Sequence, residues 1–285
     1  MAGQDAGELV LTLSCPDRPG IVHAVSGFLA ERECNIIDSQ QYGSPRTSTF
    51  FLRVHFASTV PIDTLRTQFA DVAAVFGMDW QVMATTHRPN VLVLVSRQGH
   101  CLNDLLYRWR SGSLPAEIVG VVGNHTDLEP LARASGVPFH HLPIADDTRE
   151  RQEQQLLELV EQLEIELVVL ARYMQVLSPR VCGALRGRII NIHHSFLPSF
   201  RGGRPYEQAY DHGVKLIGAT AHYVTADLDE GPIIEQEVAR VGHAHSPEAL
   251  AAVGRDLECV ALARAVRWHL EHRVLLDGQR TVVFP

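Results

Sequence analysis

An amide and an imidazole stand two residues apart where an apolar strand is predicted to end. In the segment RIINIHHSFLPSFRGGRPYEQAYDHG, Asn191 and His193 alternate with Ile190 and Ile192. Because alternate side chains of a strand share a face, the amide and the imidazole are predicted to point to the same side of a sheet. An amide N–H donates to a developing oxyanion and an imidazole moves protons, so the pair suits attack on a carbonyl group.

A carboxylate that would complete this chemistry lies further along the chain. The segment GATAHYVTADLDEGPIIEQEVARV predicts two alternating strands around a loop, 225–232, which carries Asp227, Asp229 and Glu230. A carboxylate in this loop could orient or activate the nucleophile. Taken alone, however, the residues favour a simpler interpretation, in which the amide and the imidazole cap a strand end and hydrogen-bond to neighbouring backbone.

The elements around this segment indicate an α/β domain. The run VLVLV at 91–95 is typical of a strand buried in a parallel sheet. Helical patterns then alternate with predicted strands at 117–123, 138–143, 167–171 and 188–193. This alternation predicts a Rossmann-like, mostly parallel open sheet. In such sheets ligands bind outside the carboxyl ends of the strands, which is where Asn191 and His193 fall.

A smaller unit precedes this domain. Its strands and helices follow the order βαββαβ, with strands at 9–15, 35–42, 47–56 and 79–86 and helices after positions 20 and 61. That order predicts an antiparallel, ferredoxin-like sheet with both helices on one face. Pro89 separates the βαββαβ pattern from the alternating strands and helices that follow, so we predict two domains, 1–86 and 87–285. The second is expected to end in a long helix over 246–273 and a hairpin turning at Asp277 and Gly278.

Composition and charge narrow the classes of function. A chain of 285 residues, 46% of them apolar, can bury the core of one large domain or two ordinary ones. A formal net charge of -8 argues against a nucleic-acid surface, and it leaves any anionic ligand to be held by local arginines. The first ten residues lack the features of a signal peptide, and no apolar run approaches the roughly 18 residues of a membrane span.

The cysteines indicate a reducing compartment. They are odd in number and scattered, without a CxxC pair, at Cys15, Cys34, Cys101, Cys182 and Cys259. This pattern is typical of a cytoplasmic protein with neither disulfides nor a zinc site. We therefore expect a cytoplasmic protein that binds neither nucleic acid nor membrane.

Several long motifs resemble a known family. NIHHSFLPSFRGGRPYEQAY and GATAHYVTADLDEGPII resemble the signature of the folate-dependent formyltransferase fold. With CPDRPGIVHAVSGFLAERECNIID in front, and with ARYMQVLSP and GRDLECVALARAVRWHLEHRVLLDG, residues 9–284 resemble the formyltetrahydrofolate deformylase family. The resemblance implies that Asn191, His193 and Asp229 are catalytic. It also implies hydrolysis of 10-formyltetrahydrofolate, the substrate, to tetrahydrofolate and formate, without a cofactor.

The resemblance also implies how the folate is bound. Backbone around Arg172, Met174 and Val176 would meet the pterin edge; Leu177, His222 and Gly203 are further substrate-binding positions. The residues of ARYMQVLSP alone predict a strand-to-helix turn with Pro179 opening the helix, and both interpretations can hold. The formate would supply purine synthesis and balance the one-carbon folate pool. The resemblance does not show which of His193 and Asp229 carries the proton, since coupled groups titrate as a pair.

The N-terminal unit resembles an ACT domain, a module that binds amino acids and pairs with other copies. Its candidate ligand residues are Asp17, Arg18, Gly20 and Ile21, at the N-terminus of the first helix, where a ligand carboxylate could bind. An ordinary helix N-cap beside a dimer-forming sheet edge explains the same residues equally well. The resemblance implies a homo-oligomer, a dimer or tetramer, with methionine and glycine as first candidate effectors.

One departure bears on the acceptor of the formyl group. Where related glycinamide ribonucleotide transformylases carry a glycine- and serine-rich phosphate loop, this chain has VSRQGHCLNDLL, with bulky Arg97, Gln98 and His100. A backbone cradle for phosphate needs small residues, so water is favoured as the acceptor. A formyltransferase with an amine acceptor is the alternative. A binding protein without catalysis is a third, which the intact set of Asn191, His193 and Asp229 argues against.

Other chemistries are not indicated. No Ser or Cys stands in a nucleophile elbow, which argues against a covalent acyl-enzyme mechanism. The pairs His193-His194 and His140-His141 invite a metal site, but neighbours on a strand point to opposite faces and no HExxH or CxxC is present. We therefore predict no metal, and we expect His194 to face away from the chemistry.

Overall fold

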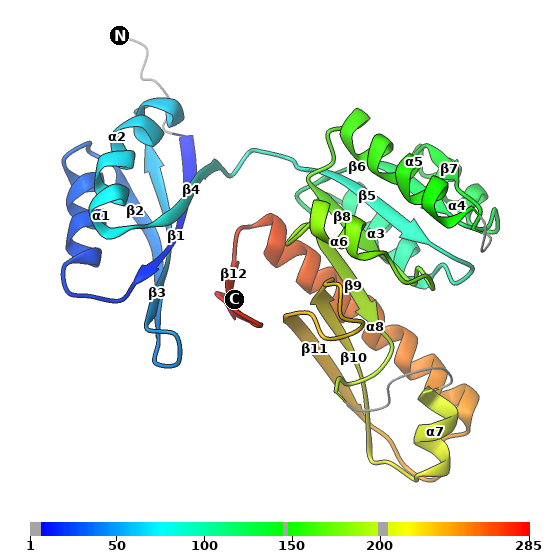
Figure 1. Ribbon diagram of the computed structural model, residues 1–285. Helices are drawn as coiled ribbons and strands as arrows, with labels where there is room; N and C mark the ends of the chain where they lie inside the picture. The colour runs from blue at the N-terminus through cyan, green and yellow to red at the C-terminus, as the bar shows by residue number, and fades with distance from the viewer. Residues whose placement is uncertain (1–6, 145–147, 199–204) are drawn as a thin grey trace. The chain divides into compact units, whose positions relative to one another are not determined.

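The computed structural model describes residues 7–144, 148–198 and 205–285. Its contacts divide the chain into two units, Met1–His87 with Glu271–Pro285 and Arg88–Leu270 (Figure 1). The sequence prediction assigned residues 271–285 to the second domain, whereas these contacts group them with the first. Gly203, predicted at the substrate site, lies outside the described residues.

The first unit has the predicted βαββαβ order. Its elements are β1 (Gly7–Pro16), α1 (Ile21–Ala30), β2 (Asn35–Ser44), β3 (Thr49–Ser58), α2 (Ile62–Phe76) and β4 (Asp79–Ala84). The strands pair in the order β2-β3-β1-β4, antiparallel throughout, which confirms the ferredoxin-like sheet. Both helices pack on one face, where Leu11 and Leu13 of β1 meet Phe28 and Phe69. The rings of Phe28 and Phe69 lie edge to face, with centroids 5.1 Å apart.

A C-terminal hairpin belongs to this first unit. It consists of β12 (Val274–Asp277) and β13 (Arg280–Val283), which pair antiparallel. Asp277 faces Arg280 in the register, so the turn is formed by residues 278 and 279, one position later than predicted. The buried Asp277 carboxylate accepts hydrogen bonds from Ser44 Oγ at 2.9 Å and Thr47 Oγ1 at 2.7 Å, which fasten the hairpin to the β2–β3 turn.

Within its described residues, the second unit contains thirteen helices and strands. They are β5 (Asn90–Val95), α3 (His100–Arg110), β6 (Glu117–Gly123), α4 (Glu129–Ala134), β7 (Phe139–His141), α5 (Arg149–Gln162), β8 (Leu167–Leu170), α6 (Pro179–Ala184), β9 (Ile189–His193), α7 (Pro205–Asp211), β10 (Leu216–Tyr223), β11 (Ile233–Arg240) and α8 (Pro247–Leu270). The sheet runs β11-β10-β9-β8-β5-β6-β7. The five strands from β9 to β7 are parallel, β10 pairs antiparallel with β9, and β11 pairs antiparallel with β10.

Helices cover both faces of this sheet. On one face α5 and α6 pack on β5 and β8, through a core that includes Leu92, Leu156, Val168 and Val181. On the other, α8 packs along β9, β10 and β11 and against α3 (Figure 1). Because both faces are buried, residues 91–95 are almost wholly inaccessible, which explains the unbroken apolar run of β5. Among the described residues, no helix is both long and apolar enough to span a membrane.

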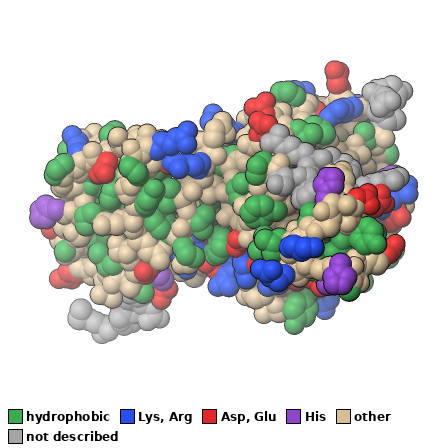
Figure 2. All heavy atoms as spheres, turned by 90° about the horizontal axis from the view of Figure 1, so that it is seen from below, with side chains coloured by type: hydrophobic (Ala, Val, Ile, Leu, Met, Phe, Trp, Pro, Cys, Tyr) green, Lys and Arg blue, Asp and Glu red, His purple; other side chains and the backbone are tan. Residues whose placement is uncertain are grey.

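Charged side chains are not segregated by sign on the surface seen from below. Figure 2 shows acidic and basic side chains interspersed with apolar and uncharged ones over this face of the second unit. What matters for function is instead the carboxyl edge of the parallel strands. There β8 and β9 lie side by side, with Leu170 paired to Asn191, so the segments that follow both strands open at the same edge.

Candidate active site

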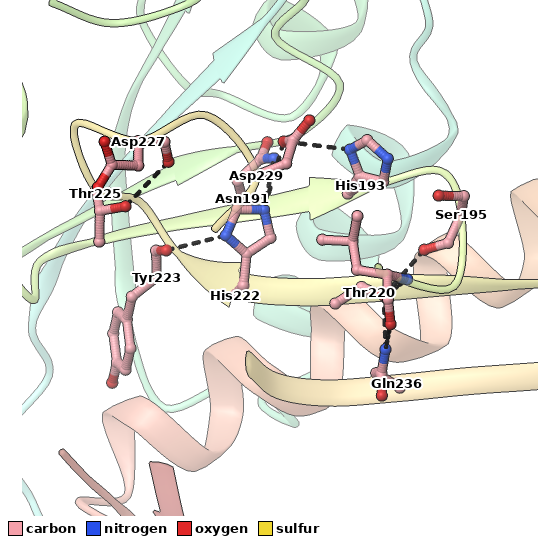
Figure 3. A network of polar contacts seen from close by, with 11 residues as sticks. Asn191, His193, Ser195, Thr220, His222, Tyr223, Thr225, Asp227, Asp229 and Gln236 are labelled. Carbon is pink, nitrogen blue, oxygen red and sulfur yellow. Dashed lines mark hydrogen bonds and ion pairs between the residues drawn. The ribbon is translucent and has the colours of Figure 1, made fainter. Parts of the chain in front are cut away.

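Asn191 and His193 lie at the carboxyl end of β9, beside the antiparallel strand β10. The register pairs Asn191 with His222 and His193 with Thr220. Asn191 Nδ2 is 3.2 Å from His222 Nε2. Figure 3 shows both of these side chains pointing toward Asp229, which also lies beside His193. The strand pairing therefore brings an amide and two imidazoles to one carboxylate.

His222 holds the amide of Asn191 in one orientation. Its Nδ1 is 2.9 Å from the backbone carbonyl of Tyr223, and a carbonyl only accepts, so Nδ1 carries the proton (Figure 3). Burial lowers the pKa of His222, which keeps the ring neutral near pH 7. Nε2 is then an acceptor and takes one N–H of Asn191, and the second N–H of that amide remains to donate to a substrate oxygen.

Asp229 contacts both imidazoles. Its Oδ1 is 3.3 Å from His193 Nδ1 and 3.8 Å from His222 Nε2. The hydrogen bond from His193 lowers the pKa of Asp229, although burial opposes the shift, so the group is a carboxylate at neutral pH. His193 Nε2, the nitrogen on the other side of the ring, is buried and has no hydrogen-bond partner among the described residues. The imidazole is thus oriented at one nitrogen and open at the other.

The loop that carries Asp229 is fixed by close backbone packing. Asp229 has a φ of 55°, in the left-handed region that residues other than glycine seldom adopt. At Gly231 an added Cβ would lie 1.7 Å from the carbonyl oxygen of Tyr223, so only glycine fits. Tyr223 N donates to the carbonyl of Pro232 at 2.9 Å, which closes the loop on the end of β10.

A cavity of about 490 Å³ opens in front of these groups. Its volume is in the range of small-molecule sites. Besides Asn191, His193 and Asp229 it is lined by the predicted substrate positions Arg172, Met174, Val176, Leu177 and His222, and by Gln98, Leu170, Tyr173, Gln175, Ile192, His194, Tyr206, Val224, Thr225, Ala226, Asp227, Leu228, Ala251, Arg255 and Glu258. The structure therefore brings the described candidates for catalysis and substrate binding into one cavity.

A buried carboxylate lies at the inner wall of this cavity. Glu258 of α8 is 1% exposed. It accepts hydrogen bonds from His100 Nε2 at 2.7 Å and Tyr206 at 2.9 Å, and Arg172 Nη1 lies 3.5 Å away. Burial opposes ionisation, but the hydrogen bond from His100 and the charge of Arg172 hold the pKa of Glu258 below its ordinary value. Glu258 is therefore a charged carboxylate surrounded by donors.

Two family models match this chain, one for each of its two parts. The model described as Formyl transferase matches residues 89–266, and the model described as ACT domain matches residues 9–74. The chain is 54% identical to formyltetrahydrofolate deformylase of Corynebacterium sp. (strain P-1), over 96% of this chain and 97% of that protein. This chain belongs to the formyltetrahydrofolate deformylase family. It is also 39% identical to the deformylase of Escherichia coli (strain K12), over 96% and 97% of the two chains.

Solved structures of the deformylase family have the same fold. The crystal structure of formyltetrahydrofolate deformylase from Burkholderia mallei superposes with a TM-score of 0.95 at 52% identity, over 98% of this chain and 100% of that one. Glycinamide ribonucleotide transformylase 1 from Symbiobacterium toebii reaches a TM-score of 0.66 at 34% identity, over 70% and 95%. These likenesses confirm both predicted parts of the fold, the ACT-type unit and the formyltransferase-type unit.

The prediction that His194 faces away from the chemistry is wrong. In this deformylase-family chain His194 lines the cavity, and its ring stacks on that of His193 with centroids 5.0 Å apart and planes at 18°. Alternation does not apply to it, because β9 ends at His193 and the next residue belongs to a turn. Burial lowers the pKa of His194 to about 4, with a contribution from the nearby charge of Arg172, so this ring is neutral at pH 7.

One group of side chains has the spacing of a metal site. The ligand atoms of His100, Cys101 and Glu258 lie within 4.8 Å of one another, the only such group among the described residues. The groups that could bind a metal ion, however, already interact with other side chains. Glu258 receives two hydrogen bonds and the charge of Arg172, and a hydrogen bond with Cys259 raises the pKa of the Cys101 thiol. A guanidinium beside the carboxylate and a thiol that keeps its proton do not suit a cation.

The candidate effector residues lie around the start of α1. Gly20, with a φ of 99°, precedes the helix, and Asp17 N donates to the carbonyl of Ser48 at 2.8 Å. The guanidinium of Arg18 lies over the ring of Phe76, 4.6 Å from its centroid. Ile21 is 2% exposed and its side chain is part of the core, so only its backbone could meet a ligand.

Sequence reasoning missed Glu258, Tyr206 and Arg255 as lining residues. Glu258 could have been identified from the sequence, because it falls in the apolar stripe of α8, eight residues after Leu250 and four before Leu262. A carboxylate in such a stripe is rarely tolerated unless it is paired. Its partner His100 lies in the segment VSRQGHCLNDLL, which lacks the small residues of a phosphate loop. Nothing in the sequence indicated that His100 and Glu258 are in contact.

Proposed function

We propose that this chain hydrolyses 10-formyltetrahydrofolate to tetrahydrofolate and formate, the reaction for which its relatives are named. The observation that carries the proposal is the setting of His193. Its Nδ1 lies against the Asp229 carboxylate, while its buried Nε2 has no described protein partner and borders the cavity shared with Asn191. Such a ring is prepared to exchange a proton with a bound reactant.

The first step is the attack of water on the formyl carbon. Asp229 holds the Nδ1 proton of His193, so Nε2 takes a proton from the water as its oxygen bonds to carbon. The electron pair of the C=O bond moves to oxygen, and the free N–H of Asn191 donates to this oxyanion. The adjacent Asp229 carboxylate stabilises the imidazolium that results.

The second step breaks the bond between the formyl carbon and N10. The electron pair of that bond goes to N10, which receives the proton from His193 Nε2, and tetrahydrofolate leaves. Formic acid loses its proton to solvent, so the balance is one formyl group and one water converted to one N–H, one formate and one proton. The imidazole thus returns to its starting state without any other reactant.

The segment after β8 supplies the folate-binding wall. Met174 and Val176 are 56% and 50% exposed, and Leu228 on the opposite loop is 60% exposed, so apolar side chains stand at the mouth of the cavity. Flat heterocycles are bound between such surfaces, with backbone groups supplying the hydrogen bonds. Backbone around Arg172, Met174 and Val176 therefore meets the pterin edge, with Leu177 and His222 beside it. Gly203 belongs to the same proposal.

Water, rather than an amine, is the acceptor in this proposal. The segment between β5 and α3 presents Arg97, Gln98 and His100, where a phosphorylated acceptor would need small residues and free backbone N–H groups. His100 is moreover engaged by Glu258 at 2.7 Å. Of these three residues Gln98 lines the cavity, and none of them is the small residue that a backbone anion cradle needs.

The cellular setting follows from the same reaction. We place the enzyme in the cytoplasm, where formate would enter purine synthesis and the folate pool would be balanced, and the five reduced cysteines fit that compartment. The ACT-type unit would form a homodimer or homotetramer and bind an amino-acid effector near Asp17, Arg18, Gly20 and Ile21. Methionine and glycine are the first effectors to test.

The test is to incubate the purified protein with 10-formyltetrahydrofolate without any amine, and to measure formate and tetrahydrofolate. We expect one formate per folate. The variants His193→Ala and Asp229→Asn should lose roughly 100-fold to 10,000-fold in kcat. Glu230→Gln is the matched control, because this exposed neighbour of Asp229 does not line the cavity. Formate release that needs an added amine, or an equal loss in the control, would contradict the proposal.

A further inference from the structure

Arg172 is a buried cation at the carboxyl edge of the sheet. It is the second residue after β8, the strand that pairs with β9, and it lines the cavity with His193 and Asp229. The residue is only 8% exposed. Its φ of 64° lies in the left-handed region, which is costly for a residue with a side chain and is found most often at functional sites. The fold therefore places this buried guanidinium in the wall of the candidate site at some conformational cost.

The guanidinium is not fully used by the protein. Its contact with Glu258 runs from Nη1 at 3.5 Å, the long limit of a hydrogen bond, while Tyr206 and His100 approach the same carboxylate at 2.9 and 2.7 Å. Arg172 Nε is buried and has no partner among the described residues. A buried N–H without an acceptor is unfavourable, so an acceptor is expected from a bound molecule.

The charge of the products indicates which molecule this is. Hydrolysis turns a neutral formyl group into the formate anion, within a cavity that already contains the carboxylates of Asp229 and Glu258. The arginines among the described lining residues are Arg172 and Arg255, and Arg255 is exposed. The neighbouring His194 is neutral at pH 7, so it cannot supply the balancing charge. Arg172 is thus the buried counter-charge available for the anion.

We propose that the Arg172 side chain forms a formate subsite, in which Nε–H and the guanidinium charge hold the oxygens of formate once the formic acid released from N10 has lost its proton. The inference rests on the proposed hydrolysis and adds a side-chain role to a residue expected to contribute only backbone. It also selects the acceptor, because transfer to an amine would leave a neutral amide that gains nothing from the cation. Water, by contrast, yields an anion that the guanidinium stabilises.

Direct binding of formate tests the subsite without turnover. Carbon-13-labelled formate is titrated against the protein in the presence of tetrahydrofolate, and its line width is followed by NMR. We expect Arg172→Met to weaken formate binding about tenfold or more, as for loss of a charge-assisted hydrogen bond. Arg172→Lys, which keeps the charge but lacks Nε–H, should be intermediate. Arg255→Met, which removes the exposed cation of the same cavity, should bind formate within about twofold of the native protein.

The outcomes separate the subsite from the reaction. Unchanged formate affinity in Arg172→Met, or equal loss in Arg255→Met, would overturn the subsite, as would loss of tetrahydrofolate affinity alone. If Arg172→Met does not fold, Arg172→Lys decides, and an affinity equal to that of the native protein would rule out the Nε–H donor. Formate binding that depends on Arg172, in a protein that releases no formate from 10-formyltetrahydrofolate, would instead contradict the hydrolysis and leave the subsite in place.

Discussion

At the scale of single residues, the roles proposed for His193 and His222 depend on what surrounds each ring nitrogen. His193 has a carboxylate at Nδ1 and no described partner at Nε2, and His222 has a carbonyl at Nδ1 and the amide of Asn191 at Nε2. The two imidazoles therefore have different functions despite similar positions on adjacent strands. In the proposed mechanism, His193 exchanges protons and His222 keeps the oxyanion donor in place.

The orienting role of His222 can be tested by substitution. His222→Leu removes the acceptor that holds Asn191, so the amide is free to rotate. We expect kcat to fall roughly 10-fold to 100-fold with little change in KM, less than the loss typical of deleting an oxyanion donor itself. His222→Gln retains an acceptor and should recover part of the rate. Steady-state kinetics of both variants is the check, and equal losses would argue against orientation of Asn191 through this contact.

His194 makes stability depend on pH. Its pKa is lowered from 6.5 to about 4 by burial, so between these values the unfolded chain binds a proton that the folded chain does not. Stability is therefore highest above pH 6.5 and falls as the pH drops toward 4, by roughly 3 kcal/mol. His194→Gln should flatten this part of the profile, measured by urea unfolding at several pH values. An unchanged slope would show that other groups cause it.

At the scale of elements, the site depends on how the loop between β10 and β11 closes. Gly231→Ala would force a Cβ within 1.7 Å of the carbonyl of Tyr223, so the loop and Asp229 must move. Since a displacement of about 1 Å can cost 100-fold in rate, we expect kcat to fall by about that factor. Gly242→Ala, where an added Cβ meets nothing within 4 Å, is the control for activity and should remain near the native rate.

Strand and helix periodicity predicted most elements, because their faces are buried on known sides. Alternation placed Asn191 and His193 at a strand end, and the apolar run of β5 indicated a parallel sheet. The same reasoning failed at His194, since alternation ends where the strand ends. It also could not link His100 to Glu258, which lie 158 residues apart and meet only through the packing of α3 on α8.

At the scale of the whole molecule, one unit combines segments from distant parts of the sequence. Residues 271–285 pack with the ACT-type unit, although the sequence prediction placed them with the catalytic domain. Local sequence patterns predicted the hairpin, and its turn to within one residue, but not the unit with which the hairpin packs. Asp277 holds the hairpin against the first unit. Its carboxylate accepts hydrogen bonds from the hydroxyls of Ser44 and Thr47, which lie 233 and 230 positions earlier in the chain.

Removing this carboxylate should destabilise the first unit. Asp277→Ala leaves two hydroxyl groups without their acceptor, and we expect a loss of about 2 kcal/mol in its free energy of unfolding. The hydrogen bond from Thr47 lowers the pKa of Asp277, so the contribution should be present above pH 3.8 and lost as the pH falls further. Calorimetry of the variant is the measurement. Asp71→Ala, an exposed carboxylate on α2, should have little effect, and equal losses would contradict the assignment.

The central claim is that water, activated by His193 and Asp229, is the acceptor of the formyl group. The most direct measurement is turnover of 10-formyltetrahydrofolate in water enriched in oxygen-18, with mass analysis of the formate. Attack by water predicts one labelled oxygen in each formate and none in tetrahydrofolate, with no amine added. Formate without label, or an N-formyl amine in place of formate when an amine is supplied, would contradict it.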